Sequence, residues 1–306
     1  MDFTTTTIAV ITMLIYALPG YLLIKTKAVK EEGIASFAKL LLFVFQPCLS
    51  LYSFNKATYT PLLFKNMGIV FAISISVQVI LIFFLWLFLK KHFDNVGYRV
   101  ASIAAVFGNV GFFGVPLLEK LLPNSPDVLA YSAVFIISLN LLAWTLGSFV
   151  LTGDKKFFSL KKLVLNPPIL TLLIALPLFF TVTKLPIEIE EIVTLLGKMT
   201  TPMSMIILGM RLALVKPKEL FCDWRNYLSS GVKLIILPLF TLALLWFLPI
   251  GTEVKSAIFI LSCCPSATVV SNLSEMYGKG QKSAANCVLL STLICVVTIP
   301  LLLLLI

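Results

Sequence analysis

Charged residues and histidine are scarce in this sequence. Of its 306 residues, 12% are charged and 59% are hydrophobic, whereas about a quarter of the residues of a soluble domain are charged. The chain therefore cannot cover a hydrophobic core with a polar surface, which excludes a soluble fold. His92 is the one histidine, and the six cysteines have no metal-ligand spacing, so we expect no metal site and no cofactor.

Long polar stretches and segments of alternating hydrophobicity are also absent, and the second absence excludes a transmembrane β-barrel. Hydrophobic residues instead form ten blocks, each long enough to cross the hydrocarbon core of a bilayer as a helix. The first block lacks a basic leader and ends in lysines, so we interpret it as a membrane helix rather than a signal peptide. We therefore predict an all-α membrane protein of about ten transmembrane helices. The blocks lie at residues 7–24, 34–54, 66–89, 98–121, 127–151, 166–183, 187–213, 225–248, 254–277 and 283–305.

The net charge of +10 comes mostly from basic residues in the short connections between blocks, so no nucleic-acid partner is needed to explain it. Sixteen lysines and arginines lie in or beside the odd-numbered connections, and five lie in or beside the even-numbered ones. Because cytoplasmic loops carry the positive excess, we predict a multi-pass protein of the plasma or inner membrane with both termini extracytoplasmic. The sixteen are Lys25, Lys27, Lys30, Lys90, Lys91, Arg99, Lys155, Lys156, Lys161, Lys162, Arg211, Lys216, Lys218, Arg225, Lys279 and Lys282, and the five are Lys56, Lys65, Lys120, Lys184 and Lys255.

The two halves of the sequence correspond at an offset of about 155 residues. Five helices per half is an odd number, so the second copy must cross the membrane in the opposite orientation, as in the inverted repeats of many secondary transporters. We predict one membrane unit in which residues 1–155 form the first five-helix repeat and residues 156–306 the second. The matched positions are Pro47 and Pro202, Gln78 and Lys233, Arg99 and Lys255, and Glu119 and Glu275.

The fourth and ninth blocks contain residues that interrupt helices. Glycines, Asn109 and Pro116 fall together in the fourth block, and in a helix each glycine costs about 1 kcal/mol and proline about 3 kcal/mol. Pro265 interrupts the ninth block at the equivalent depth. Broken helices at membrane depth are tolerated only where they are buried or line a wet cavity, and their N-terminal ends favour anions. The breaks therefore predict a substrate site, with a pair of packing kinks as the alternative.

One segment of the fourth block, Gly108-Asn-Val-Gly-Phe-Phe-Gly-Val-Pro-Leu117, resembles the glycine-asparagine-proline segment of the auxin efflux carrier family. Other landmarks of that family match in order over nearly the whole chain, and the short connections resemble its prokaryotic branch. That branch includes permeases for malonate and malate and is related to the plant PIN-FORMED carriers. The further landmarks are residues 140–147, 166–169, 277–278 and 291–300.

The resemblance implies a ten-helix fold of two inverted repeats, similar to sodium/proton antiporters and bile-acid symporters. Helices 1, 2, 6 and 7 would form a scaffold, and helices 3–5 and 8–10 a transport unit that moves as an elevator, with broken helices 4 and 9 crossing in it. It also implies a small organic anion as the substrate and a homodimer formed through the scaffold. The chain departs from the pattern at Val269, where many relatives carry asparagine.

We expect substrate contacts from polar and small residues at the two breaks and beside them. The amides of Asn109 and Asn140 are suited to bind a carboxylate or, alternatively, to satisfy freed backbone groups. Lys198 lies about one turn before Pro202 and would attract an anion or extend to the interface, and we expect Lys233 to extend to the interface. The candidate set is Asn109, Gly111, Pro116, Asn140, Pro265, Ser266, Thr268, Asn272 and Lys198.

The leading hypothesis is a secondary transporter of a small organic anion, such as a mono- or dicarboxylate, with the lipid bilayer as its other partner. No aspartate lies deep in any block, which disfavours a cation antiporter because coupling needs a coordinating or titrating oxygen. The alternative is a sodium-coupled organic anion symporter of the bile-acid-transporter type. We predict no enzyme activity, because one loop histidine cannot supply a convergent catalytic set, and a sensor would usually carry an appended soluble domain.

Overall fold

The computed structural model describes residues 3–125, 127–154 and 167–306. Over these ranges the regular elements are all helices, and the only β-bridge joins Gly108 and Ser266. Seven helical segments are long and apolar enough to cross a membrane. They confirm a multi-pass helical membrane protein. The seven are Phe3–Lys25, Gly33–Lys56, Pro61–His92, Val128–Thr152, Ile187–Leu214, Trp224–Trp246 and Gln281–Leu303.

These segments coincide with seven of the ten hydrophobic blocks, and the other three blocks are helical as well. The fourth block forms two separate helices, α6 (Val96–Ala104) and α7 (Val115–Leu121), and the ninth forms α17 (Thr252–Cys263) and α18 (Thr268–Met276). In its described residues the sixth block forms α11 (Pro167–Phe180). Both breaks therefore occur where glycine and proline predict them.

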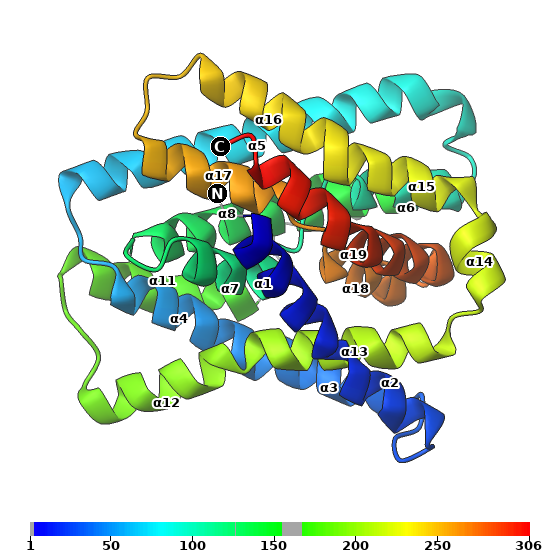
Figure 1. Cartoon of the computed structure of the whole chain (residues 1–306), viewed down its shortest axis with the longest axis horizontal. Coiled ribbons are helices and arrows are strands. Elements are labelled where there is room, and N and C mark those ends of the chain that lie inside the picture. Colours follow the sequence, from blue (N-terminus) through cyan, green and yellow to red (C-terminus); the bar gives the residue numbers. More distant parts are fainter. Residues whose placement is uncertain (1–2, 126, 155–166) are drawn as a thin grey trace.

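The remaining elements complete the two halves of the chain (Figure 1). The first half contains α1 (Phe3–Ile15), α2 (Ala17–Lys25), α3 (Gly33–Leu40), a π-helical turn (Leu41–Phe45), α4 (Gln46–Lys56), α5 (Pro61–Leu89), a 3₁₀ turn (Lys90–His92), a π-helical turn (Val110–Gly114), α8 (Val128–Leu142), a π-helical turn (Ala143–Gly147) and α9 (Ser148–Thr152). The second half contains α12 (Ile187–Lys198), α13 (Thr200–Leu214), α14 (Pro217–Cys222), α15 (Trp224–Gly231), a π-helical turn (Val232–Ile236), α16 (Leu237–Trp246) and α19 (Gln281–Leu303).

Helix α5 begins earlier than hydrophobicity predicts, at Pro61 rather than residue 66. The Thr60 hydroxyl accepts a hydrogen bond from the backbone N–H of Leu63 at 3.0 Å and so caps the helix. Proline in the first helical turn adds to this start signal, because its missing N–H would have no intrahelical acceptor there.

The prolines of the second and seventh blocks sit at interruptions that correspond between the halves. The π-helical turn ends directly before α4, whose second residue is Pro47, and α12 gives way to α13 two residues before Pro202. Proline lacks an N–H and its ring clashes with the preceding turn, so each interruption has the same cause. The Thr200 hydroxyl donates to the Phe45 carbonyl at 3.0 Å, which joins the two interruptions.

Two glycines bring α2 and α13 into backbone contact. A Cβ atom on Gly20 would lie 1.9 Å from the carbonyl oxygen of Ile206, and one on Gly209 would lie 1.8 Å from that of Ala17. Such close approach is what small residues provide between membrane helices. Helix α4 packs in turn against α11 and α12. The elements of blocks 1, 2, 6 and 7 therefore share interfaces with one another.

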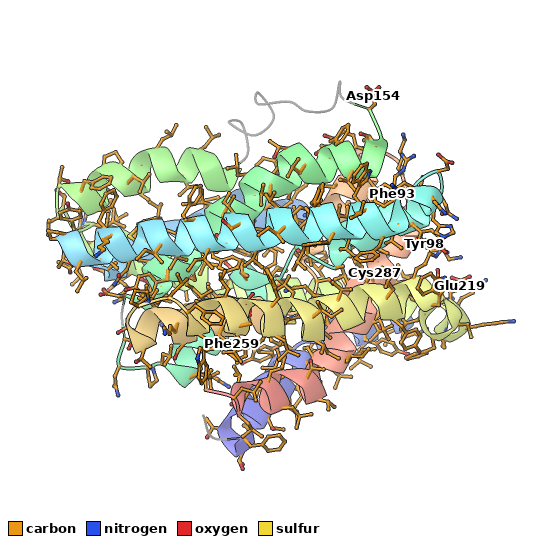
Figure 2. All side chains as sticks on the ribbon, turned by 90° about the horizontal axis from the view of Figure 1, so that it is seen from above. Phe93, Tyr98, Asp154, Glu219, Phe259 and Cys287 are labelled. Atoms are coloured by element: carbon orange, nitrogen blue, oxygen red, sulfur yellow. The ribbon has the colours of Figure 1, made fainter. Side chains whose placement is uncertain are left out.

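The connections between blocks gather at two opposite ends of the molecule. Those after α4, α11 and α16 lie at one end of Figure 1, and those after α2, α5 and α13 lie at the other. Figure 2 places Phe93, Asp154 and Glu219, from three odd-numbered connections, together at one end. Two hydrogen bonds also join odd-numbered connections to one another, because Arg225 donates to Asn95 and Lys279 donates to the Thr152 carbonyl. Successive blocks thus run in alternating directions.

Candidate functional site

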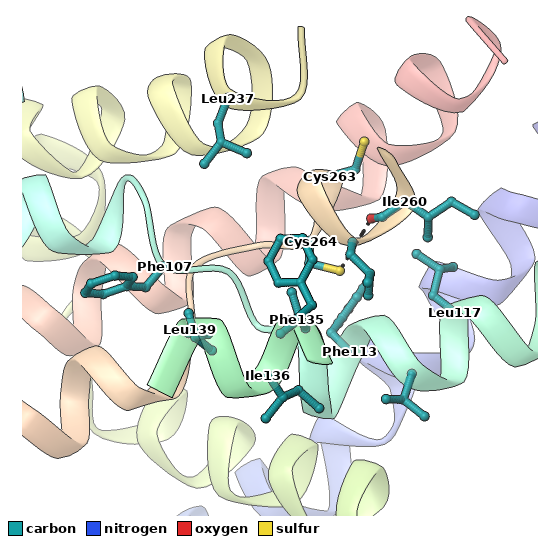
Figure 3. Packing of buried hydrophobic residues seen from close by; sticks show 14 of the residues in the cluster. Phe107, Phe113, Leu117, Phe135, Ile136, Leu139, Leu237, Ile260, Cys263 and Cys264 are labelled. Atoms are coloured by element: carbon teal, nitrogen blue, oxygen red, sulfur yellow. Dashed lines mark hydrogen bonds between the residues drawn. The ribbon is translucent and has the colours of Figure 1, made fainter. Parts of the chain in front are cut away.

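The two broken helices cross through their interrupted segments, residues 105–109 and residues 264–267, which together we call the crossing. The backbone N–H of Asn109 donates to the carbonyl of Pro265 at 2.7 Å, and the N–H of Ala267 donates to the carbonyl of Phe107 at 2.8 Å. The segments thereby run antiparallel for a short distance, as Figure 3 shows around Phe107 and Cys264. A break leaves backbone N–H and carbonyl groups without their helical hydrogen bonds. Here each break hydrogen-bonds such groups of the other, so these groups are satisfied without water.

Ser266 holds the crossing together with its side chain and its backbone. Its hydroxyl donates to the Ala104 carbonyl, the last of α6, at 2.7 Å. Its N–H donates to the hydroxyl of Ser291 on α19 at 3.0 Å. Both serines are fully buried. The crossing is therefore fixed to α6 and α19 as well as to itself.

A cavity of about 590 Å³ lies beside the crossing. Its walls come from the crossing, α3 with the π-helical turn after it, α8 with the π-helical turn after it, and α18. Most of the wall is apolar, with a few polar groups, which is the usual make-up of a small-molecule site. The lining residues are Ala35, Ala38, Lys39, Leu42, Phe43, Gln46, Gly108, Asn109, Val110, Gly111, Phe112, Ile136, Leu139, Asn140, Trp144, Ala267, Thr268, Val269, Asn272, Glu275 and Met276.

The structure brings together at this cavity five of the nine sequence-derived candidates: Asn109, Gly111, Asn140, Thr268 and Asn272. Val269, which the family resemblance expects to be asparagine, lies on the same wall. An apolar side chain therefore occupies this cavity-facing position on the α18 side.

The other four candidates lie outside the cavity lining. Pro265 and Ser266 belong to the crossing itself, and Pro116 lies in the first turn of α7. Lys198 is exposed, with its Nζ 5.8 Å from the centre of the Tyr52 ring. Of these four, the first three shape the backbone of the site, whereas Lys198 is separate from it.

Asn109 and Asn140 differ in how their amides are used. The Asn140 Nδ2 donates to the Ile136 carbonyl of its own helix at 2.9 Å. The Asn109 side chain does not cap the following π-helical turn, and within the described ranges no hydrogen bond to it is formed. Main-chain bonds satisfy the nearby backbone of the crossing, so the Asn109 amide is not needed to cap it and stays open to the cavity.

Two helix starts face this cavity. Helix α18 begins at Thr268, and the helical turns that lead into α7 begin at Val110, and both residues line the wall. The first N–H groups of a helix have no intrahelical acceptor and carry a partial positive charge. The Val110 N–H itself is bonded to the Gly108 carbonyl at 2.8 Å, so the positive ends of the two helices and the Asn109 amide are what suit this cavity to an anion.

Lys233 is a residue whose position the sequence analysis misjudged, because we expected it to extend to the membrane interface. Its side chain is fully buried, and its Nζ donates to the carbonyl of Ser262 in the last turn of α17 at 2.8 Å. A Cβ atom on Gly108 would lie 3.0 Å from this Nζ. The ammonium therefore lies directly behind a residue of the cavity wall. The match between Lys233 and Gln78, a polar residue deep in the third block, was the sequence signal that could have indicated a buried position.

Arg211 is a second functional candidate outside the predicted set. Its Nη2 lies 2.9 Å from Oε1 of Glu275, so an ion pair joins α13 to α18 at the rim of the cavity. The Arg211 side chain is mostly buried, whereas that of Glu275 is half exposed. Arg211 also lines a small adjoining space with Thr268 and Asn272. In the described part of the chain, no cluster of three histidine, cysteine or acidic side chains could hold a metal ion.

A family model described as "Membrane transport protein" matches residues 5–303, which is nearly the whole chain. A search of curated proteins finds no match.

Proposed function

Because the chain belongs to the membrane transport protein family, which is that of the auxin efflux carriers, we propose that it is a secondary carrier of a small organic anion. The proposed substrate is a mono- or dicarboxylate, moved across the cell membrane by alternating access. The family is one of transporters and not of enzymes, and the site holds binding groups rather than a catalytic set.

The observation that carries this proposal is the position of the Asn109 amide. It lies on the wall of a cavity where two helix starts meet, and no described residue hydrogen-bonds its side chain. The amide is open to the cavity, and a carboxylate supplies strong acceptors for its donors. Basic groups close by, with Lys39 on the wall and Lys233 behind it, add attraction for negative charge.

The proposed mechanism is a movement of the crossing relative to the elements of blocks 1, 2, 6 and 7. The cavity lies between these two sets, since α3 and the turn after it form one wall and the crossing forms the other. The corresponding interruptions before Pro47 and Pro202 support two repeats of opposite orientation. An inverted pair of repeats can exchange conformations, which opens the site alternately to either side.

The orientation we propose places the odd-numbered connections in the cytoplasm and both termini outside it, in a plasma or inner membrane. The cavity rim contains Lys39, Glu275 and Met276, which lie near odd-numbered connections. In this orientation the conformation is open to the cytoplasm. A homodimer through blocks 1, 2, 6 and 7 remains a prediction of the family resemblance.

The sodium-coupled alternative has less support. Of the acidic side chains described, only Glu275 lines the cavity, and it is paired with Arg211. A sodium site would need several oxygen ligands around the ion, and the carbonyls of Phe107 and Pro265 already accept the hydrogen bonds that join the crossing.

The test is uptake by the protein reconstituted in liposomes, with labelled dicarboxylates, monocarboxylates and indole acids as probes, with and without sodium and proton gradients. A hydrogen bond to a charged group contributes about 1.5–3 kcal/mol, so Asn109→Ala should weaken uptake of the accepted probe by about 10- to 150-fold. Asn109→Asp should abolish it, because the added negative charge repels the anion.

The matched control is Asn66→Ala, since Asn66 bonds to the Tyr131 hydroxyl away from the cavity. It should leave uptake unchanged. If Asn109→Ala transported the accepted probe with unaltered affinity and rate, the site would not lie where we propose it.

A further inference from the structure

Lys233 carries a buried positive charge, although its side chain does not line the main cavity. It is 1% exposed, and its one hydrogen bond in the described structure is to the Ser262 carbonyl. None of the four ion pairs formed between described residues includes it. A lysine inside a membrane protein is costly and is usually paired or functional, so an ammonium without a carboxylate partner needs an explanation.

The position of this ammonium links it to the site. Gly108 lines the main cavity and also a smaller space on the opposite side, which Lys233 lines too. Because a Cβ on Gly108 would come within 3.0 Å of the Lys233 Nζ, only the backbone of the crossing segment separates the charge from the cavity. Asn109 is the next residue in that segment. At such short range in a low-dielectric interior, the ammonium attracts an anion held at Asn109.

The corresponding position in the first half carries no charge. Gln78 lies 155 residues before Lys233 and lines the same small space. Its Nε2 donates to the Ser74 carbonyl at 2.9 Å, and its buried Oε1 has no partner in the described structure. The two repeats thus place one neutral amide and one cation behind the crossing, which leaves a net positive charge there.

Resting on the proposed function, we propose that Lys233 is a fixed countercharge that travels with the crossing and neutralises a bound monoanion. Lys233 bonds to α17, whose end begins the crossing, so movement of the crossing carries the ammonium with it. The carrier loaded with a monoanion then moves little net charge through the membrane. The empty carrier moves one positive charge, so the membrane potential acts on its return.

The competing explanation is structural, because the ammonium also bonds to a carbonyl at the C-terminal end of α17, where positive charge is favourable. A countercharge depends on the amount of charge behind the crossing, whereas this role depends on the particular contact with Ser262. Moving the charge to the other repeat separates the two explanations. Lys233→Gln removes it, and the double variant Lys233→Gln with Gln78→Lys places it on the corresponding position.

The experiment records transient charge movement after voltage steps across membranes that contain the protein without any substrate. We expect wild type to show a saturable transient, Lys233→Gln to lose it, and the double variant to recover it. Lys233→Arg should keep it. Thermal unfolding in detergent identifies variants that fail to fold. Lys233→Met, which keeps an unbranched side chain one atom shorter and without charge, should behave as Lys233→Gln does.

Three results would overturn the proposal. The wild type could show no transient, the folded Lys233→Gln and Lys233→Met variants could retain it, or the double variant could fold without recovering it. These measurements use no organic anion, so they fail or succeed independently of the uptake assay with Asn109→Ala. Loss of uptake selectivity for anions with an intact transient would therefore count against the proposed function and not against the moving charge.

Discussion

The contact between α2 and α13 gives a sharp prediction for Gly209→Ala. A new Cβ would lie 1.8 Å from the Ala17 carbonyl oxygen, whereas ordinary contacts begin at 3.4 Å, so the helices would have to separate by about 1.6 Å. Backbone atoms cannot rotate away as a side chain can. Overpacking of this kind costs about 1–3 kcal/mol, which corresponds to a fall in Tm of at least about 2 °C in a chain of this size.

Gly68→Ala is the matched control, because it makes the same substitution in a helix with nothing within 4 Å of the new atom. Alanine there should raise Tm slightly, since glycine disfavours a helix by about 1 kcal/mol. The assay is thermal unfolding in one detergent, followed by circular dichroism. Equal Tm values for Gly209→Ala and Gly68→Ala would refute the reasoning.

The double variant of Gly20 and Gly209 sharpens this test. Both residues lie in the interface between α2 and α13, so separation forced by one alanine makes room for the other. The Tm loss of the double variant should therefore be clearly smaller than the two single losses together. Additive losses would mean that the two contacts yield independently of each other.

Two further predictions concern the crossing and the cavity rim. Ser266→Ala removes the 2.7 Å hydrogen bond to the Ala104 carbonyl and should lower the free energy of unfolding by about 1–3 kcal/mol. The control is Ser271→Ala, whose buried hydroxyl has no partner in the described structure, and it should leave stability unchanged in the same unfolding assay. Arg211→Gln should reduce stability more in wild type than in a Glu275→Gln background, because it breaks their 2.9 Å ion pair, and equal losses in both backgrounds would contradict a direct interaction.

Sequence reasoning located the breaks because their cause is local. Helix-breaking residues act on their own segment, and Gly108, Asn109 and Pro265 lie in the two interruptions, whereas Pro116 lies in the first turn of α7. The placement of Asn109 and Thr268 at the cavity followed, since both lie directly at the breaks. Hydrophobicity also predicted the blocks well, with the early start of α5 as an exception caused by the Thr60 cap.

The direction of side chains around an intact helix could not be predicted. A helix of a membrane bundle is apolar both toward lipid and toward its neighbours, so its hydrophobic pattern does not show which side faces inward. Lys198 and Lys233 illustrate this, because both are lysines in long apolar blocks. One is exposed beside Tyr52, and the other is buried behind Gly108.

The bonds that join the two breaks are made mainly by main-chain atoms. Phe107, Asn109, Pro265 and Ala267 contribute only N–H and carbonyl groups to the pairing. Side chains on the cavity wall, such as that of Val269, can therefore be exchanged without breaking the main-chain bonds of the joint. Such an architecture separates the main-chain bonds that join the two broken helices from the side chains that shape the cavity, so the cavity wall can be redesigned while the joint is kept.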